Sequence, residues 1–194
     1  MNLRDDESGQ AACARARGEF FTEVLPKLKV DVVLAVGLSR SDPYWETRLA
    51  GRDAPAGESL AQLQVRTTRE TVETIRAAGP EVVIASSMLG TGGFGLDGFD
   101  PIECLAKARR LADCAVHPPL KRPTVDHAYG VLATEGAGVH AVDFSPVICP
   151  GHPVCAPVIG RTVVWKDSDH VTTKVLLERA PQIWRRLEAT GAFG

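Results

Sequence analysis

Three short aliphatic segments, each preceded by a stretch with helical periodicity, constrain the fold of this chain most strongly. They are Val30–Val36, Glu81–Ser86 and Val139–Asp143. Short runs rich in valine and other aliphatic residues are typical of strands buried on both faces of a parallel sheet. The alternation of helix and strand therefore predicts an α/β fold, with helices on both faces of the sheet. Three strands make a thin parallel sheet, so we expect a first strand to be missing from the chain.

Four segments carry apolar residues at helical spacing and end near glycine or proline. We expect helices over residues 10–25, 67–78, 124–135 and 172–189. Pro26 is expected to close the first of these helices, and Pro181 to interrupt the last. Smaller elements are expected as a helix over 101–112, a short helix started by Ser41–Pro43 and an edge strand over 161–165, with loops over 38–61 and 144–160.

Length and composition favour one domain over residues 1–194, with a long loop insertion at about 88–119. The formal net charge of -2 leaves no basic field for a polyanion, so nucleic acid is not an expected partner. No apolar run approaches the ~20 residues of a membrane helix. The charged N-terminus also lacks the apolar centre of a signal peptide.

Five cysteines form the most unusual part of the composition. Two close couples, Cys104 with Cys114 and Cys149 with Cys155, lie in loop-like sequence. Such couples indicate two disulfides and an oxidising compartment, against the alternative of unrelated reduced thiols in the cytosol. Cys13 has no neighbour, which indicates a partner cysteine outside this chain.

The second couple allows another interpretation, because His152 lies between its two cysteines. Two thiolates and an imidazole are potential zinc ligands, with His117, His170 or Cys13 as the fourth. The first cysteine couple and the uncertain fourth ligand favour a disulfide, and we expect neither a metal nor a cofactor. A non-catalytic zinc- or carbohydrate-binding module built on this loop is the alternative function.

The segment Asp167-Ser168-Asp169-His170 is the strongest candidate for chemistry. It follows the last strand-like segment and precedes a helix, where ligand-handling loops of α/β sheets gather. A carboxylate three residues before a histidine can orient the imidazole as a general base. The competing interpretation is helix capping by Asp167 or Asp169, with an incidental histidine.

A nucleophile is harder to find. Gly37-Leu38-Ser39 follows a strand and loosely matches a nucleophile elbow, which makes Ser39 a weak candidate. Its loop-like continuation is a poor match for the helix that an elbow feeds. The run Gly90–Gly95 matches a dinucleotide-binding pattern literally, but acidic loop residues follow it instead of a helix, which argues against a nucleotide cofactor.

Several residues together resemble the SGNH-type domain of bacterial membrane acyltransferases of the acyltransferase-3, or O-antigen acetylase, kind. The cysteine couples come in the family's order. Cys104, within Pro101–Leu105, comes first with Cys114, and Val142-Asp143 then leads to Cys149 and Cys155. Val163-Val164-Trp165-Lys166 then leads into the D-x-x-H motif and an amphipathic terminal helix. The resemblance covers most of the chain.

This resemblance implies a three-layer, flavodoxin-like fold on the extracytoplasmic face of the cell envelope. The domain would be fused to a membrane acyltransferase and would move acetyl or other acyl groups onto cell-surface polysaccharides or lipids. His170 would be the general base and Asp167 its orienting carboxylate. A serine would attack the acyl carbonyl while backbone N–H groups stabilise the oxyanion.

The chain departs from the family at the nucleophile. The family places it in a G-D-S-H motif directly after the first strand, and no G-D-S stands in these 194 residues. The oxyanion asparagine is also in doubt, because Asn2 is the only asparagine. Gly37 and the backbone at Ser39 are the nearest stand-ins. We therefore expect an N-terminally truncated domain, without its first strand and nucleophile, that is inactive alone.

Overall fold

The computed structural model describes residues 2–3, 7–37, 45, 49–50, 55–89, 96 and 98–193. The chain divides into two compact units. The first unit comprises Met1–Ala35, Arg40–Ile84 and Thr124–Ala141, and the second comprises Val36–Ser39, Ala85–Pro123 and Val142–Gly194. That residues 1–194 form a single domain stays a prediction.

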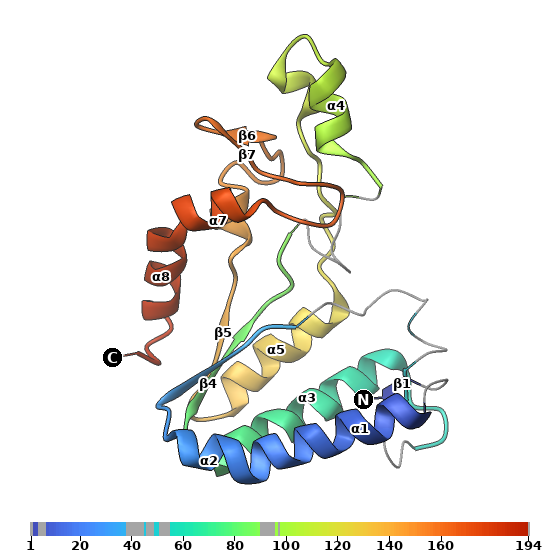
Figure 1. Cartoon of the computed structure of the whole chain (residues 1–194), viewed down its shortest axis with the longest axis vertical. Coiled ribbons are helices and arrows are strands. Elements are labelled where there is room, and N and C mark those ends of the chain that lie inside the picture. Colours follow the sequence, from blue (N-terminus) through green and yellow to red (C-terminus); the bar gives the residue numbers. More distant parts are fainter. Residues whose placement is uncertain are drawn as a thin grey trace. The chain divides into compact units, whose positions relative to one another are not determined.

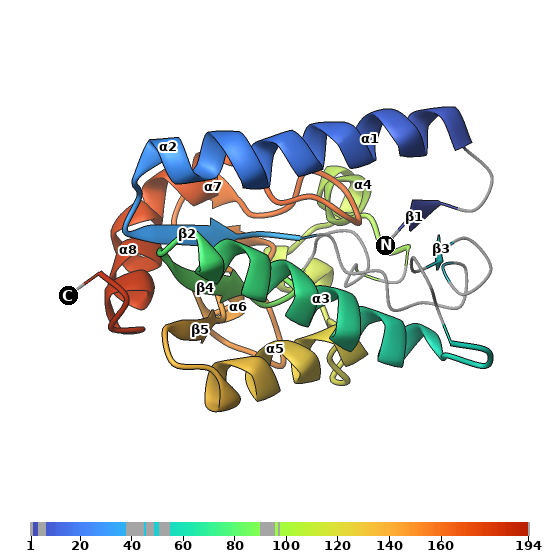
Figure 2. The same ribbon diagram turned by 90° about the horizontal axis from the view of Figure 1, so that it is seen from below.

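A parallel sheet of order β2-β4-β5 is built from the three aliphatic segments, as predicted (Figure 2). Its strands are β2 (Val32–Ala35), β4 (Glu81–Ala85) and β5 (Val139–Val142). The register of β2 on β4 runs from Val32 opposite Glu81 to Ala35 opposite Ile84. β4 is the central strand, and Val82 and Val83 are completely buried. The edge strand β2 is more open, with Leu34 42% exposed.

The N-terminal helix is longer than predicted, because Pro26 does not close it. α1 (Glu7–Glu19) continues through a π-helical segment, η1 (Phe20–Val24), into α2 (Leu25–Leu28). Pro26 lies in the first turn of α2, directly after the π-helical segment, and the backbone is helical at Val24 and Leu25 before it. The helix ends instead at Lys29, which has the left-handed φ of 49°.

The helix α3 (Leu60–Ala77) also begins earlier than the predicted residue 67. Ser59 caps it through a reciprocal pair of bonds with Gln62, which supplies partners for backbone N–H groups at the helix start. α5 (Thr124–Glu135) has the predicted bounds and packs against α3 (Figures 1 and 2). Helices and strands of this unit share one core, formed by Leu25, Val72, Ile75, Val82, Ile84, Leu132 and Val139.

Two short antiparallel pairs complete the strands. β1 (Asn2–Leu3) pairs with β3 (Leu49–Ala50) in the first unit, and β3 lies within the segment 38–61 predicted as loop. In the second unit, β6 (Val158–Ile159) and β7 (Thr162–Val163) form a hairpin. Gly160 occupies its two-residue turn at φ 63°, a conformation that glycine adopts at little cost. The predicted edge strand over 161–165 is therefore limited to β7 and a single bridge between Trp165 and Val171.

The helices of the second unit are short. They are α4 (Pro101–Lys107), the 3-10 helix η3 (Leu111–Cys114), α6 (Ser145–Ile148), α7 (Thr173–Glu178) and α8 (Ala180–Glu188). The helix predicted over 101–112 is thus split, and the loop predicted over 144–160 contains α6 and β6. The terminal helix is interrupted at Arg179, because Pro181 belongs to the first turn of α8. The segment Ser41–Pro43, predicted to start a helix, lies outside the described residues.

The core of the second unit surrounds Trp165, which is completely buried. Its other buried members are Leu89, Leu96, Val116, Ile148, Cys149, Cys155, Val164 and Val175. This core underlies the loop that follows Trp165. Among the described residues, the helices are too short or too polar to cross a bilayer.

Candidate active site

The Asp167–His170 segment is a tight loop, and the backbone segments on its two sides are hydrogen-bonded to each other. Trp165 and Val171 form an antiparallel bridge at its base, and the Lys166 N–H donates to the His170 carbonyl over 2.8 Å. On the far side, the Leu96 N–H donates to the Ser168 carbonyl over 3.0 Å. His170 is exposed on this loop, yet the loop backbone is fixed by hydrogen bonds at its base and at Ser168.

Within this loop, Asp167 and His170 contact each other directly. Nδ1 of His170 lies 2.8 Å from Oδ1 and 3.0 Å from Oδ2 of Asp167. The imidazole side chain is 68% exposed and the carboxylate 38% exposed. Among the residues that the structure describes, Nε2 of His170 has no hydrogen-bond partner. A neutral imidazole that donates from Nδ1 to Asp167 therefore presents an unprotonated Nε2 to the outside.

The competing interpretation, that these aspartates cap a helix, is wrong. The N-cap of α7 is Thr172, whose Oγ1 accepts from the Val175 N–H. The Thr172 hydroxyl also donates to the Val163 carbonyl over 2.6 Å. Asp167 instead accepts from the backbone N–H of Asp169 over 2.8 Å, which closes a turn inside the loop.

These contacts keep the carboxylate charged. The backbone N–H of Asp169 and then the His170 imidazole lower the pKa of Asp167 below its ordinary value. Asp169 points elsewhere, since its carboxylate accepts from the Ser168 hydroxyl over 2.8 Å. Asp167 is thus the carboxylate of this loop that contacts the imidazole.

The other predicted residues of a catalytic site are Ser39 and Gly37. Ser39, the weak nucleophile candidate, lies outside the described residues, as does the glycine run 90–95. Gly37 is exposed and follows β2.

Both cysteine couples are disulfides, as predicted. The Cα atoms are 5.7 Å apart in Cys104–Cys114 and 4.9 Å apart in Cys149–Cys155. The second disulfide is buried in the core beneath the site loop. Its sulfurs are bonded to each other and are not available as thiolate ligands, so the zinc interpretation of this loop is wrong. Cys13 is a free, exposed cysteine.

A cluster that sequence reasoning missed lies where β4 and β5 end. Nη2 of Arg122 is 2.6 Å from Oδ2 of Asp143, and the Ser145 N–H donates to the other oxygen of the same carboxylate. The buried Ser145 hydroxyl accepts from the Leu89 N–H over 3.4 Å. These contacts hold together the segments that leave the two strands. An aspartate directly after a strand was a visible signal, but its arginine comes from a distant loop.

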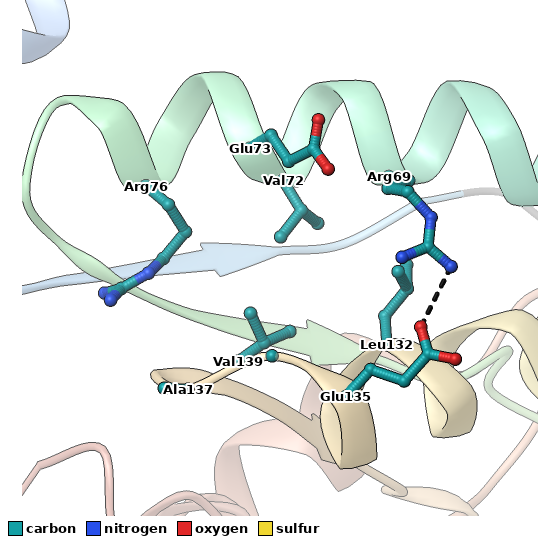
Figure 3. A pocket seen from close by; sticks show the side chains of 9 residues that line it. Arg69, Val72, Glu73, Arg76, Leu132, Glu135, Ala137 and Val139 are labelled. Atoms are coloured by element: carbon teal, nitrogen blue, oxygen red, sulfur yellow. Dashed lines mark hydrogen bonds and ion pairs between the residues drawn. The ribbon is translucent and has the colours of Figure 1, made fainter.

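A separate cavity of about 300 Å³ lies in the first unit between α3 and α5 (Figure 3). Val72, Leu132 and Val139 form its apolar lining, and Arg69 pairs with Glu135 across it at 2.9 Å. The positive charges of its two arginines are compensated by two glutamates in the same lining, Glu73 and Glu135. It contains none of the predicted site residues.

The fold and the loop define an α/β protein with a candidate histidine–carboxylate base pair after its last strand. Comparison with protein families finds a match to the SGNH domain (fused to AT3 domains) over residues 2–185. The chain belongs to this family, which confirms the predicted SGNH-type α/β fold. No curated protein and no solved structure matches the chain.

Proposed function

We propose that this chain supplies the base pair of an SGNH-type acyl transfer centre, with His170 as general base and Asp167 as its orienting residue. The observation that carries the proposal is the contact of both Asp167 oxygens with Nδ1, which leaves Nε2 open on an exposed loop. Family membership supports acyl chemistry of this kind.

In the proposed reaction, Nε2 of His170 takes the proton of a serine hydroxyl as its oxygen attacks an acyl carbonyl. This attack forms the new oxygen–carbon bond and gives a tetrahedral intermediate. Collapse of the intermediate breaks the bond between the acyl carbon and the former alcohol, which takes the proton from the imidazolium as it leaves. A second alcohol, or water, then accepts the acyl group by the reverse sequence. Asp167 holds the imidazole in the required tautomer and stabilises the imidazolium.

The substrates of the proposed reaction are an acyl donor, acetyl or longer, and a hydroxyl of a cell-surface polysaccharide or lipid. The fusion to AT3 domains in the family supports a membrane acyltransferase as the partner. Two disulfides support an extracytoplasmic location, because such bonds persist in oxidising compartments.

We further propose that the isolated chain does not turn over esters, since no G-D-S motif stands in its sequence. A serine-directed fluorophosphonate probe tests this on the purified protein, and no labelling is expected. Labelling that disappears in both Ser39→Ala and His170→Ala would identify Ser39 as the nucleophile and overturn the inactivity. Labelling that persists in His170→Ala would contradict the base pair itself.

The base role is tested in cells that express the gene. His170→Ala should lower the acyl content of the surface polysaccharide by a factor on the order of 10²–10⁴, the usual contribution of a general base. His152→Ala is the matched control, because His152 is an exposed histidine of the same unit. Equal acylation in the His170 and His152 variants would exclude the proposed role.

A further inference from the structure

A polar pocket of about 680 Å³ lies in the second unit, between the β6–β7 hairpin and the junction of α7 with α8. This volume is in the range of small-molecule sites. Its polar lining residues are Arg161, Thr162, Lys174, Glu178, Arg179 and Gln182. None of them belongs to the Asp167–His170 pair, and neither the family match nor the proposed function assigns them a role.

Charge in this pocket is positive. Three cationic side chains and one carboxylate line it, which is a formal surplus of +2 in a chain whose net charge is -2. The carboxylate of Glu178 is already engaged, because it accepts from the buried Thr162 hydroxyl over 2.9 Å and lies 3.9 Å from Nζ of Lys174. The surplus therefore belongs to Arg161 and Arg179, and it favours an anionic ligand.

One acceptor in the lining lacks a donor. Oε1 of Gln182 is buried and has no hydrogen-bond partner among the described residues. A buried acceptor without a donor is costly, and a hydroxyl group would satisfy it. Carboxylates and phosphates at neutral pH bring acceptors but few donors. A ligand that matches both the positive charge and the unpaired acceptor must carry an acidic group and hydroxyl groups within one small molecule or sugar unit.

We propose that this pocket binds an acidic sugar unit of a polysaccharide, with its carboxylate at Arg161 and Arg179 and a hydroxyl at Gln182. That this polysaccharide is the acyl acceptor rests on the proposed function; the binding itself does not. Thr162 in the pocket wall is five residues from Asp167. Five residues of chain span at most about 18 Å, so one glycan of several units reaches both places.

Isothermal titration with tetragalacturonate, an acidic oligosaccharide, tests the proposal on the whole chain. Wild-type protein should bind it, and maltotetraose, a neutral oligosaccharide of the same length, should bind at least about tenfold more weakly. Arg161→Ala/Arg179→Ala should also lose at least about tenfold in Kd. Arg185→Ala is the matched control, because this exposed arginine of α8 lies outside the pocket, and its Kd should be unchanged.

Three results would overturn the proposal: no binding by the wild type, equal binding by the double arginine variant, or equal binding of the neutral oligosaccharide. Circular dichroism verifies that the variants fold. If the double variant does not fold, Arg161→Ala alone, at the exposed hairpin turn, replaces it.

The Gln182→Leu variant tests the hydroxyl contact. It should weaken the binding of tetragalacturonate several-fold and leave the binding of inorganic phosphate unaffected. Phosphate binding as tight as tetragalacturonate binding would also overturn the proposal, because it would mean a site for anions in general. His170→Ala should bind normally, so failure of the proposed reaction is distinguishable from failure of this site.

Discussion

Nδ1 of His170 lies within hydrogen-bonding distance of both carboxylate oxygens of Asp167, at 2.8 and 3.0 Å. The pair is local in sequence, but its geometry depends on a loop closed by the Trp165–Val171 bridge. Because the carboxylate is also held by the Asp169 N–H, the imidazole has a fixed partner on one side and an open nitrogen on the other.

The tautomer of His170 is the first testable consequence. At alkaline pH, nitrogen-15 NMR should find the proton of the neutral imidazole on Nδ1, and Asp167→Asn should reduce this preference, since an amide no longer fixes the donor. His140 is an internal comparison, because its Nε2 lies 2.7 Å from Glu81, and we expect its proton on Nε2. A proton on Nε2 of the neutral His170 imidazole would contradict the assignment of the pair.

Acid should break the hydrogen bond between Asp167 and the Asp169 N–H only at a pH below the ordinary pKa of an aspartate. The folded pKa of Asp167 is lowered, so the ionised carboxylate stabilises the loop fully above the unfolded value of about 3.9. This contribution is lost as the pH falls through the lower folded value. The Asp169 amide shift, followed by NMR down to acid pH, should titrate below about 3.9. Asp167→Asn should abolish this transition, whereas a midpoint at or above about 3.9 would refute the hydrogen-bonded turn.

The two disulfides should differ in what they contribute to stability. Their sequence separations of 10 and 6 residues are similar, so loss of loop closure costs roughly 2–3 kcal/mol in either case. Cys149 and Cys155 are both buried in the core around Trp165, whereas Cys104 is partly exposed. Cys149→Ala/Cys155→Ala should therefore cost about 1–2 kcal/mol more than Cys104→Ala/Cys114→Ala, measured by urea unfolding. Equal costs would mean that packing of the second disulfide contributes little.

Gly138 should be less replaceable than a glycine in open space. Gly138 and Gly57 have similar φ values, 71° and 80°, but a Cβ at Gly138 would lie 2.6 Å from the Arg76 guanidinium. That guanidinium donates to the Pro80 carbonyl over 2.8 Å and would have to move. Gly138→Ala should thus cost about 1 kcal/mol more than Gly57→Ala in the free energy of unfolding. In an Arg76→Ala background the difference should vanish, and a difference that persists would exclude this cause.

Much of the fold was predictable because it is encoded locally. The aliphatic segments at Val30, Glu81 and Val139 each became a strand, and α5 has the predicted bounds. The early start of α3 was also visible, since Ser59 and Gln62 have the spacing of a capping box. The interruption of the terminal helix was predictable too, because Pro181 lies in the first turn of α8 and α7 ends before it. The prediction at Pro26 was wrong, because the backbone keeps helical φ and ψ up to this proline and α2 continues through it.

The sequence by itself determined the elements, the cysteine couples and the D-x-x-H spacing, because each depends on residues close together in the chain. Tertiary structure alone decided the rest. Arg122 forms an ion pair with Asp143, which is 21 residues away in the sequence. The polar pocket of the second unit is lined by the β6–β7 hairpin and by the junction of α7 with α8. Such contacts depend on how distant segments pack, and no local pattern records a partner that only packing brings near.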